Sequence, residues 1–237
     1  MASLRKYVIL RDDFIAGKSG DDAIDGMGDL GSWIVTDVAG AADSDVDFVS
    51  TAATVKGHPG VISLNTGPTT PAADDEGSLS LSNVDAIILN DPSDGLADSD
   101  EFVYVGAIVR FPAIADVEFN FGLFDAANAA GRGVNSVSVE YDESADAEFN
   151  LVVVDGSTAT AVATDVVVAI DTWYLLEIAA TEDEAYLFIN GVQKAHTTSA
   201  NIPDDEGLTP VFKIAAEGAA EQSVLIDAFM LKIPVSR

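Results

Sequence analysis

The chain has 237 residues, 48% hydrophobic and 22% charged, so it can bury a substantial core. Forty acidic residues against 11 basic ones give a net charge of −29, and a surface this acidic repels the phosphate backbone of nucleic acids. The absence of cysteine excludes disulfides and thiolate chemistry. No apolar run approaches the roughly 18 residues that span a membrane. The charge therefore predicts no nucleic-acid partner, and the short apolar runs predict no membrane partner.

The first residues, MASLRKYVILRDDF, contain only a short apolar run, Tyr7–Leu10, before Arg11 and two aspartates. That run is too short for the core of a signal peptide, so the sequence predicts no export by the general secretory route. Aspartate outnumbers glutamate by 28 to 12, and lysine occurs six times. This composition is typical of proteins from salt-loving organisms. At about 1 M salt the Debye length falls to about 3 Å, so repulsion between the acidic side chains is nearly abolished.

Strand-like runs bounded by Gly, Asp, Asn and Pro recur along the whole chain, and helical periodicity is almost absent. In chain order, the expected strands are Lys6–Phe14, Ser32–Val38, Phe48–Val55, Val61–Thr66, Ser78–Ser82, Ala86–Leu89, Glu101–Phe111, Val117–Phe124, Ser136–Tyr141, Asn150–Val154, Ala159–Val168, Thr172–Thr181, Glu184–Asn190, Thr209–Ala215 and Ser223–Ile233. About fifteen short strands at this spacing predict an all-β fold, a two-sheet antiparallel β-sandwich.

Nothing in the sequence indicates a domain boundary. The Pro-, Gly- and Asp-rich stretches 67–77, 90–100 and 201–207 have the length of loops at the ends of a sandwich. We therefore expect a single domain over residues 1–237, with residues 1–12 as an N-terminal arm or first strand. The pair Asn190-Gly191 predicts a type I′ hairpin turn, because both residues tolerate positive φ.

Metal-binding candidates are weak. His58 follows a glycine before a predicted strand and His196 follows the predicted hairpin, so a structural or exposed role is expected of both. Three acidic groups could supply oxygen ligands to calcium: Asp43, Asp45 and Asp47; Asp98 and Asp100; and Asp204, Asp205 and Glu206. None has the EF-hand spacing, so we predict no cofactor and assign no metal ligand, with a structural Ca²⁺ or other cation as the alternative.

Catalytic motifs are also weak. The chain has no GxSxG motif and no Ser-His-Asp trio that stands out. The run Glu140-Tyr141-Asp142-Glu143-Ser144 begins like the ExDxE or ExDxxE signature of jelly-roll glucanases, but Ser144 and Ala145 occupy the two places where the third carboxylate would be. Because retaining glycosidases need paired carboxylates, we predict that the protein is not an enzyme, and a glucanase-like glycoside hydrolase is the remote alternative.

Sugar binding without catalysis usually requires exposed aromatic side chains with polar partners. The sequence has two tryptophans, Trp33 and Trp173, and both lie in apolar strand contexts. We expect both to be buried in the core, and carbohydrate therefore stays an alternative ligand.

Several segments resemble known families. The late hairpin TWYLLEIAATEDEAYLFINGVQKAH (172–196) and the closing strand LIDAFMLKI (225–233), with Asp227, resemble concanavalin-A-like or laminin-G-like jelly rolls. Four earlier segments, in this order, resemble a group of tailed-phage virion proteins with that fold: DDFIAG (12–17), LGSWIV (30–35), HPGVISLNTGPTT (58–70) and VYVGAIVRFPAIADVEFNFGLFDA (103–126). The resemblance covers most of the chain and brings no catalytic residue with it.

The resemblance implies a jelly roll that serves as a non-enzymatic structural protein of a tailed-virus virion, assembled in the host cytoplasm. We expect a capsid-exterior decoration or turret-type protein, a homo-oligomer such as a trimer, with other capsid or tail proteins as partners. The alternative is a tail or fibre component that acts as a carbohydrate-binding host-attachment module. The basic cluster Arg5, Lys6 and Arg11 is expected either to contact an acidic neighbour or to be part of a plain first strand.

Overall fold

The computed structural model describes residues 6–12, 33–38, 45–48, 60–66, 75–81, 87, 89, 102–125, 132–204 and 206–235. Within these ranges the chain forms strands and no helix, so nothing described is a helix that could cross a membrane. The strands are β1 (Lys6–Asp12), β2 (Trp33–Val38), β3 (Asp45–Phe48), β4 (Ile62–Asn65), β5 (Asp75–Leu81), β6 (Val103–Arg110), β7 (Val117–Phe124), β8 (Ser136–Asp142), β9 (Asp146–Asp155), β10 (Thr158–Val167), β11 (Trp173–Ala180), β12 (Ala185–Ile189), β13 (Val192–Thr197), β14 (Thr209–Ala216) and β15 (Ser223–Val235).

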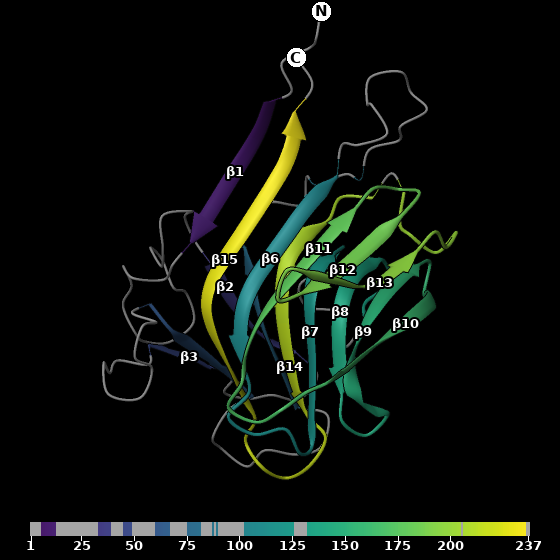
Figure 1. Cartoon of the computed structure of the whole chain (residues 1–237). Helices are drawn as coiled ribbons and strands as arrows, with labels where there is room; N and C mark the ends of the chain where they lie inside the picture. The colour runs from purple at the N-terminus through teal and green to yellow at the C-terminus, as the bar shows by residue number, and fades with distance from the viewer. Residues whose placement is uncertain are drawn as a thin grey trace, which may run out of the picture.

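These strands form two stacked antiparallel sheets, which confirms the predicted β-sandwich (Figure 1). The eight-stranded sheet has the order β13-β12-β11-β6-β15-β4-β3, and β1 also pairs with β15. The seven-stranded sheet has the order β10-β9-β8-β7-β14-β5-β2. The first and last strands of the described chain, β1 and β15, therefore lie side by side, and both sheets contain strands from the two halves of the sequence.

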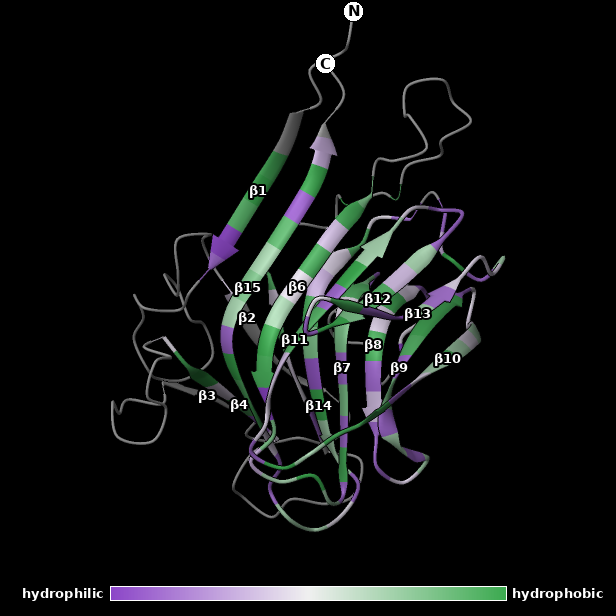
Figure 2. Cartoon of the chain, viewed as in Figure 1, coloured by the Kyte–Doolittle hydropathy of each residue, from purple (hydrophilic) through white to green (hydrophobic). Residues whose placement is uncertain are grey.

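The hydrophobic core lies between the two sheets because apolar residues alternate along most strands and share the inward face. Figure 2 shows this alternation as bands of hydrophobic and hydrophilic residues along the strands. On β6 the inward residues are Val103, Val105, Ala107 and Val109. On β7 they are Val117, Phe119, Phe121 and Leu123, all fully buried.

The two tryptophans have different environments. Trp33 is fully buried, as predicted, and its ring packs edge-on against Phe229 at 5.0 Å between centroids. Its indole Nε1 donates a hydrogen bond to Oδ2 of the buried Asp12, at 2.9 Å, so the DDF and GSW segments meet in the fold. The expectation for Trp173 is wrong: its side chain is only partly buried, and the Arg110 guanidinium lies 5.9 Å from its ring centroid.

Two predicted strands differ from the structure, and one observed strand was not predicted. β3 covers residues 45–48, whereas the expected strand began at residue 48 and ran into positions outside the described residues. The expected strand at 86–89 is reduced, among its described positions, to a single bridge between Ile87 and Leu208. The sequence did not predict β13, because its run VQKAHT buries only Ala195 and lacks a repeating apolar face.

The Asn190-Gly191 turn is confirmed. Both residues have positive φ, 53° and 73°, as a type I′ turn requires. The turn also holds the neighbouring strand, because the Asn190 side-chain oxygen accepts a hydrogen bond from the Leu175 backbone N–H at 2.9 Å. Its role in the fold is therefore structural.

A close approach between β7 and β8 at Gly122 generates a stability prediction. A Cβ added to Gly122 on β7 would lie 2.2 Å from the Val137 carbonyl oxygen and 2.7 Å from the Ser138 Cα, both backbone atoms of β8. We expect Gly122→Ala to lower the free energy of unfolding by at least about 2 kcal/mol in urea titrations, because the two strands must separate. The matched control is Gly106→Ala, whose Cβ would meet nothing closer than 3.4 Å. A wild-type urea midpoint for Gly122→Ala would contradict the prediction.

Candidate functional site

A row of polar side chains crosses the outer face of the seven-stranded sheet. Strand register places them side by side on five neighbouring strands: Ser78 on β5, Lys213 on β14, Asn120 on β7, Glu140 on β8 and Asn150 on β9. We call these five residues the polar row. Their exposed fractions lie between 0% and 7%, although polar side chains on an outer face are ordinarily solvated. Burial of so many polar groups costs free energy unless each group forms a hydrogen bond or an ion pair. A ligand could provide such partners, so we take the polar row as the candidate site.

Glu140 is paired with Arg132. The Arg132 guanidinium donates through Nε to Glu140 Oε2 at 2.6 Å and through Nη2 to Oε1 at 2.5 Å, a bidentate ion pair. The Arg132 side chain is 42% exposed and that of Glu140 only 5%, so Arg132 lies on the solvent side of the pair. Arg132 thus covers this end of the polar row.

The glucanase-like run is incomplete in three dimensions as well as in sequence. Glu140 and Asp142 share the outer face of β8, but the strand ends at Asp142. Ser144, at the place of the third carboxylate, lies in the following turn, where its hydroxyl donates a hydrogen bond to Asp142 Oδ1 at 2.8 Å. The third residue of the signature is therefore absent from the strand that carries the first two.

Glu118 flanks the polar row on β7 and lies opposite Asp142 in the strand register. Burial is the main cause that raises the pKa of Glu118 to about 7, and the nearby carboxylates of Glu140, Glu76 and Asp142 add to it. The Asn120 side-chain amide donates to Glu118 Oε1 at 2.9 Å and partly offsets the rise. The site therefore holds a carboxyl group that exchanges its proton near neutral pH.

Lys213 lies between Ser78 and Asn120 in the polar row and is 1% exposed. Its ammonium nitrogen is 4.4 Å from the centroid of the Phe124 ring, within cation–π range. Burial lowers the pKa of Lys213 to about 8, while the carboxylates of Glu76, Asp125 and Glu118 favour its charged form. The centre of the site is thus a desolvated cation among carboxylates.

Several buried oxygens of this site have no hydrogen-bond partner among the described residues. They are Asn120 Oδ1 in the polar row, Ser138 Oγ beside Glu140 on β8, and Asp125 Oδ1 at the end of β7. Each buried oxygen without a donor costs about 1–3 kcal/mol. A ligand that carries several hydroxyl groups would supply the missing donors, and Glu118 and Asp142 beside the row are only partly buried.

The other candidates from the sequence do not gather at one site. Among the described residues, no group of three or more His, Cys, Asp or Glu side chains could hold a metal ion. Asp45 and Asp47 lie on β3, Asp204 and Glu206 are exposed, and His196 is exposed on β13. His58, Asp43, Asp98, Asp100, Asp205 and Arg5 lie outside the described residues. Lys6 and Arg11 lie on β1, where Arg11 is exposed, and Asp227 occupies a register shift of β15.

The sequence reasoning missed every member of the polar row except Glu140, and it also missed the flanking Glu118 and Arg132. A signal existed for three of them. Glu118 and Asn120 alternate with the apolar side of VEFNFGLF, and Lys213 is the one charge in the strand TPVFKIAA. Arg132 carries no such signal, because it precedes β8 and reaches Glu140 only through the fold.

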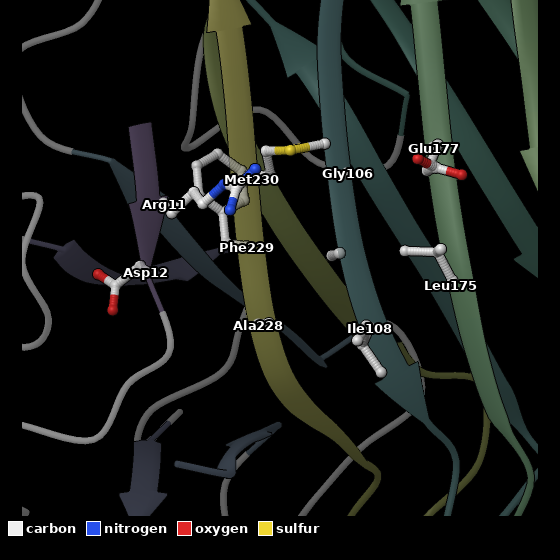
Figure 3. A pocket seen from close by; sticks show the side chains of 10 residues that line it. Arg11, Asp12, Gly106, Ile108, Leu175, Glu177, Ala228, Phe229 and Met230 are labelled. Carbon is white, nitrogen blue, oxygen red and sulfur yellow. The ribbon is translucent and has the colours of Figure 1, made fainter. Parts of the chain in front are cut away.

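A separate hollow of about 370 Å³ lies on the outer face of the eight-stranded sheet, above Gly106 (Figure 3). Met230 and Arg11 lie on one side of it, and Leu175 and Glu177 on the other. The hollow is mostly apolar, and burial raises the pKa of Glu177. It shares no residue with the polar row.

Comparisons with known proteins identify the fold. No protein-family model matches the chain, and no curated protein sequence matches it. Among solved structures, a protein of unknown function from Shewanella oneidensis MR-1 superposes with a TM-score of 0.60 at 14% identity, covering 100% of this chain and 90% of that one. The Emp47p carbohydrate recognition domain gives 0.55 at 14% identity, with 94% of each chain covered.

The β-glucanase of Bacillus licheniformis is a further structural neighbour, with a TM-score of 0.56 at 9% identity over 94% of this chain and 97% of that one. Identities this low show the fold and nothing finer. The chain is a concanavalin-A-like jelly roll, as the late hairpin and closing strand implied. The neighbours include lectin and glucanase domains, and none of these three is described as a virion protein.

The raised pKa of Glu118 predicts a pH-dependent stability. The Glu118 carboxyl keeps its proton up to about pH 7 in the folded chain and only up to about pH 4.5 in the unfolded chain. The contribution of this proton to the free energy of unfolding is therefore fully present below pH 4.5 and is lost as the pH rises through 7. We expect Glu118→Gln to unfold with wild-type free energy at pH 4 and to be more stable at pH 8, by up to about 3 kcal/mol. Urea titrations at both pH values measure the difference.

The control is Glu143→Gln, which removes one exposed negative charge at the same end of the sheet. If Glu118→Gln and wild type respond identically to pH, the Glu118 carboxyl is not buried as described.

Proposed function

We propose that this protein is a non-enzymatic carbohydrate-binding module and that its ligand occupies the polar row. The observation that carries the proposal is the set of buried oxygens that have no donor within the part of the chain that the structure describes, Asn120 Oδ1, Ser138 Oγ and Asp125 Oδ1. Sugar hydroxyls donate hydrogen bonds, so a bound glycan would satisfy oxygens that now cost free energy. The neighbours support the same class, since one is a carbohydrate recognition domain and another a β-glucanase.

The site favours binding over hydrolysis. A nucleophilic carboxylate must be free to attack, whereas Glu140 is held through both oxygens by Arg132. The third position of the glucanase-like run is Ser144, in a turn, and it bonds to Asp142 instead of facing a ligand. Arg132, exposed at 42%, would have to move aside or turn toward the ligand, and its guanidinium then becomes a donor for sugar oxygens.

Two serines on one face of β8 give a matched test. Ser138 Oγ has no partner, while Ser136 Oγ donates to the Arg132 carbonyl oxygen at 2.8 Å. Removing Ser138 Oγ deletes an unsatisfied group, so Ser138→Ala should raise the free energy of unfolding by about 1 kcal/mol and weaken glycan binding several-fold. Ser136→Ala should lower stability by a similar amount and leave binding unchanged.

Binding is measured against a panel of soluble glucans, mannans and galactans by calorimetry, and stability by urea titration. Reducing ends are assayed in the same incubations, and none should appear. If Ser138→Ala is destabilised, or if no glycan in the panel binds, the polar row is a structural network and the proposal fails. Hydrolysis that disappears in Glu140→Gln would establish an enzyme instead.

A structural role in a tailed-virus particle stays a second candidate, predicted from the resemblance. The observation that favours it is that Asp12 and Trp33, from two of the segments that carry the resemblance, form one buried hydrogen bond. Capsid decoration, homo-oligomeric assembly and a virion location remain predictions. The copy number in a purified particle tests them: hundreds of copies indicate the capsid, a handful the tail, and none excludes the role.

A further inference from the structure

The outer face of the eight-stranded sheet carries a second row of side chains, on the side of the sandwich opposite the polar row. Register places five residues side by side on β15, β6, β11, β12 and β13: Lys232, Tyr104, Ala179, Tyr186 and His196. We call these five residues the tyrosine row. Its middle residue is an alanine, so a hollow of about 330 Å³ opens between the two tyrosines. One strand separates Tyr104 from Tyr186, which places their Cα atoms about 10 Å apart.

Aromatic rings form the walls of this hollow and hold one another in place. The Phe102 ring meets Tyr186 edge-to-face at 5.6 Å and Tyr104 at 6.1 Å between centroids. Phe188 lies nearly parallel to Tyr186 at 6.4 Å. All four rings are only partly buried, so they present apolar surface to solvent in a fixed arrangement. Pockets for small ligands are mostly lined in this way, with a few polar groups that set orientation.

The polar groups of the hollow suit hydroxyl groups. The Tyr186 hydroxyl donates to Glu184 Oε2 at 2.7 Å, and His196 Nε2 lies 3.4 Å from the same oxygen. A carboxylate has about four acceptor positions, so Glu184 retains capacity for further donors. Gln193, exposed at the rim, supplies both a donor and an acceptor.

The charges around the hollow favour a neutral occupant. The Lys232 ammonium lies 4.5 Å from the Tyr104 ring centroid and would oppose a cation there. An acidic ligand would meet Glu184 and the chain's net charge of −29. A neutral sugar ring fits both constraints, because its apolar face stacks on aromatic rings while its hydroxyls bond to Glu184 and Gln193.

We propose that the hollow above Ala179 is a second carbohydrate site, which binds a neutral pyranose ring of a glycan. The proposal does not depend on the polar row, because the two sites share no residue. Gly106 lies two residues from Tyr104 on the same face of β6, about 7 Å along the strand, and opens the hollow shown in Figure 3. The surface therefore has room for a further sugar unit, and oligosaccharides should bind more tightly than a single sugar.

The test is a titration of ¹⁵N-labelled full chain with four neutral hexasaccharides: β-1,3-glucan, β-1,4-glucan, mannan and galactan. Saturable shifts of the Ala179, Tyr186 and Gln193 amides are expected with at least one of them. Tyr186→Ala removes a stacking ring and Ala179→Leu fills the hollow, so each should weaken that binding at least about ten-fold. Tyr186→Phe keeps the ring and should lose only a few-fold.

The controls separate this site from the first. Trp173→Ala removes a partly buried aromatic ring on the same sheet outside the hollow and should bind as wild type. Ser138→Ala should also leave these shifts unchanged. The proposal is overturned if no hexasaccharide gives saturable shifts up to about 10 mM, or if folded Ala179→Leu binds as wild type. Urea midpoints confirm that each variant is folded, and Ala179→Leu and Tyr186→Phe keep the test decisive should Tyr186→Ala not fold.

Discussion

The register between antiparallel strands is the constraint on which both candidate surfaces depend. Side chains alternate between the two faces of a strand, so a slip of one residue would move every outward side chain into the core. The pairing of β7 with β8 and β14 brings Asn120, Glu140 and Lys213 together, although they lie far apart in the sequence. Gly122 permits the close approach of β7 and β8, because any side chain there would meet the β8 backbone.

The two outer faces differ in the kind of side chain that they carry and in how far it is buried. On the seven-stranded sheet, polar groups are buried, which shifts the pKa of Glu118 upward and that of Lys213 downward. On the eight-stranded sheet, aromatic rings are left partly exposed and support one another edge-to-face. Each arrangement costs free energy in the absence of a ligand, in one case through unsatisfied oxygens and in the other through exposed apolar surface.

Much of the fold could be predicted from local patterns. Alternation identified the strands that the structure shows as β6 and β7, and turn chemistry identified Asn190-Gly191. The sites could not be predicted in the same way, because register across five strands is not visible in any one segment. Glu140 was noticed for its spacing from Asp142, but its partner Arg132 is set by the fold. Trp173 was expected in the core because apolar neighbours suggest burial, yet its strand presents it outward beneath Arg110.

The sandwich places the polar row and the tyrosine row on outer faces that point in opposite directions. Both sheets, about 10 Å apart, lie between the two rows, so a glycan bound to one face would have to pass around the edge of the sandwich to reach the other. If both proposed sites bind glycans, a protein of this shape would have two binding sites for polysaccharide strands and would join separate strands rather than follow one. Because the protein carries a net charge of −29, each molecule that joins two polysaccharide strands would also bring fixed charge and counterions between them. These ions would draw in water and swell the cross-linked polysaccharide.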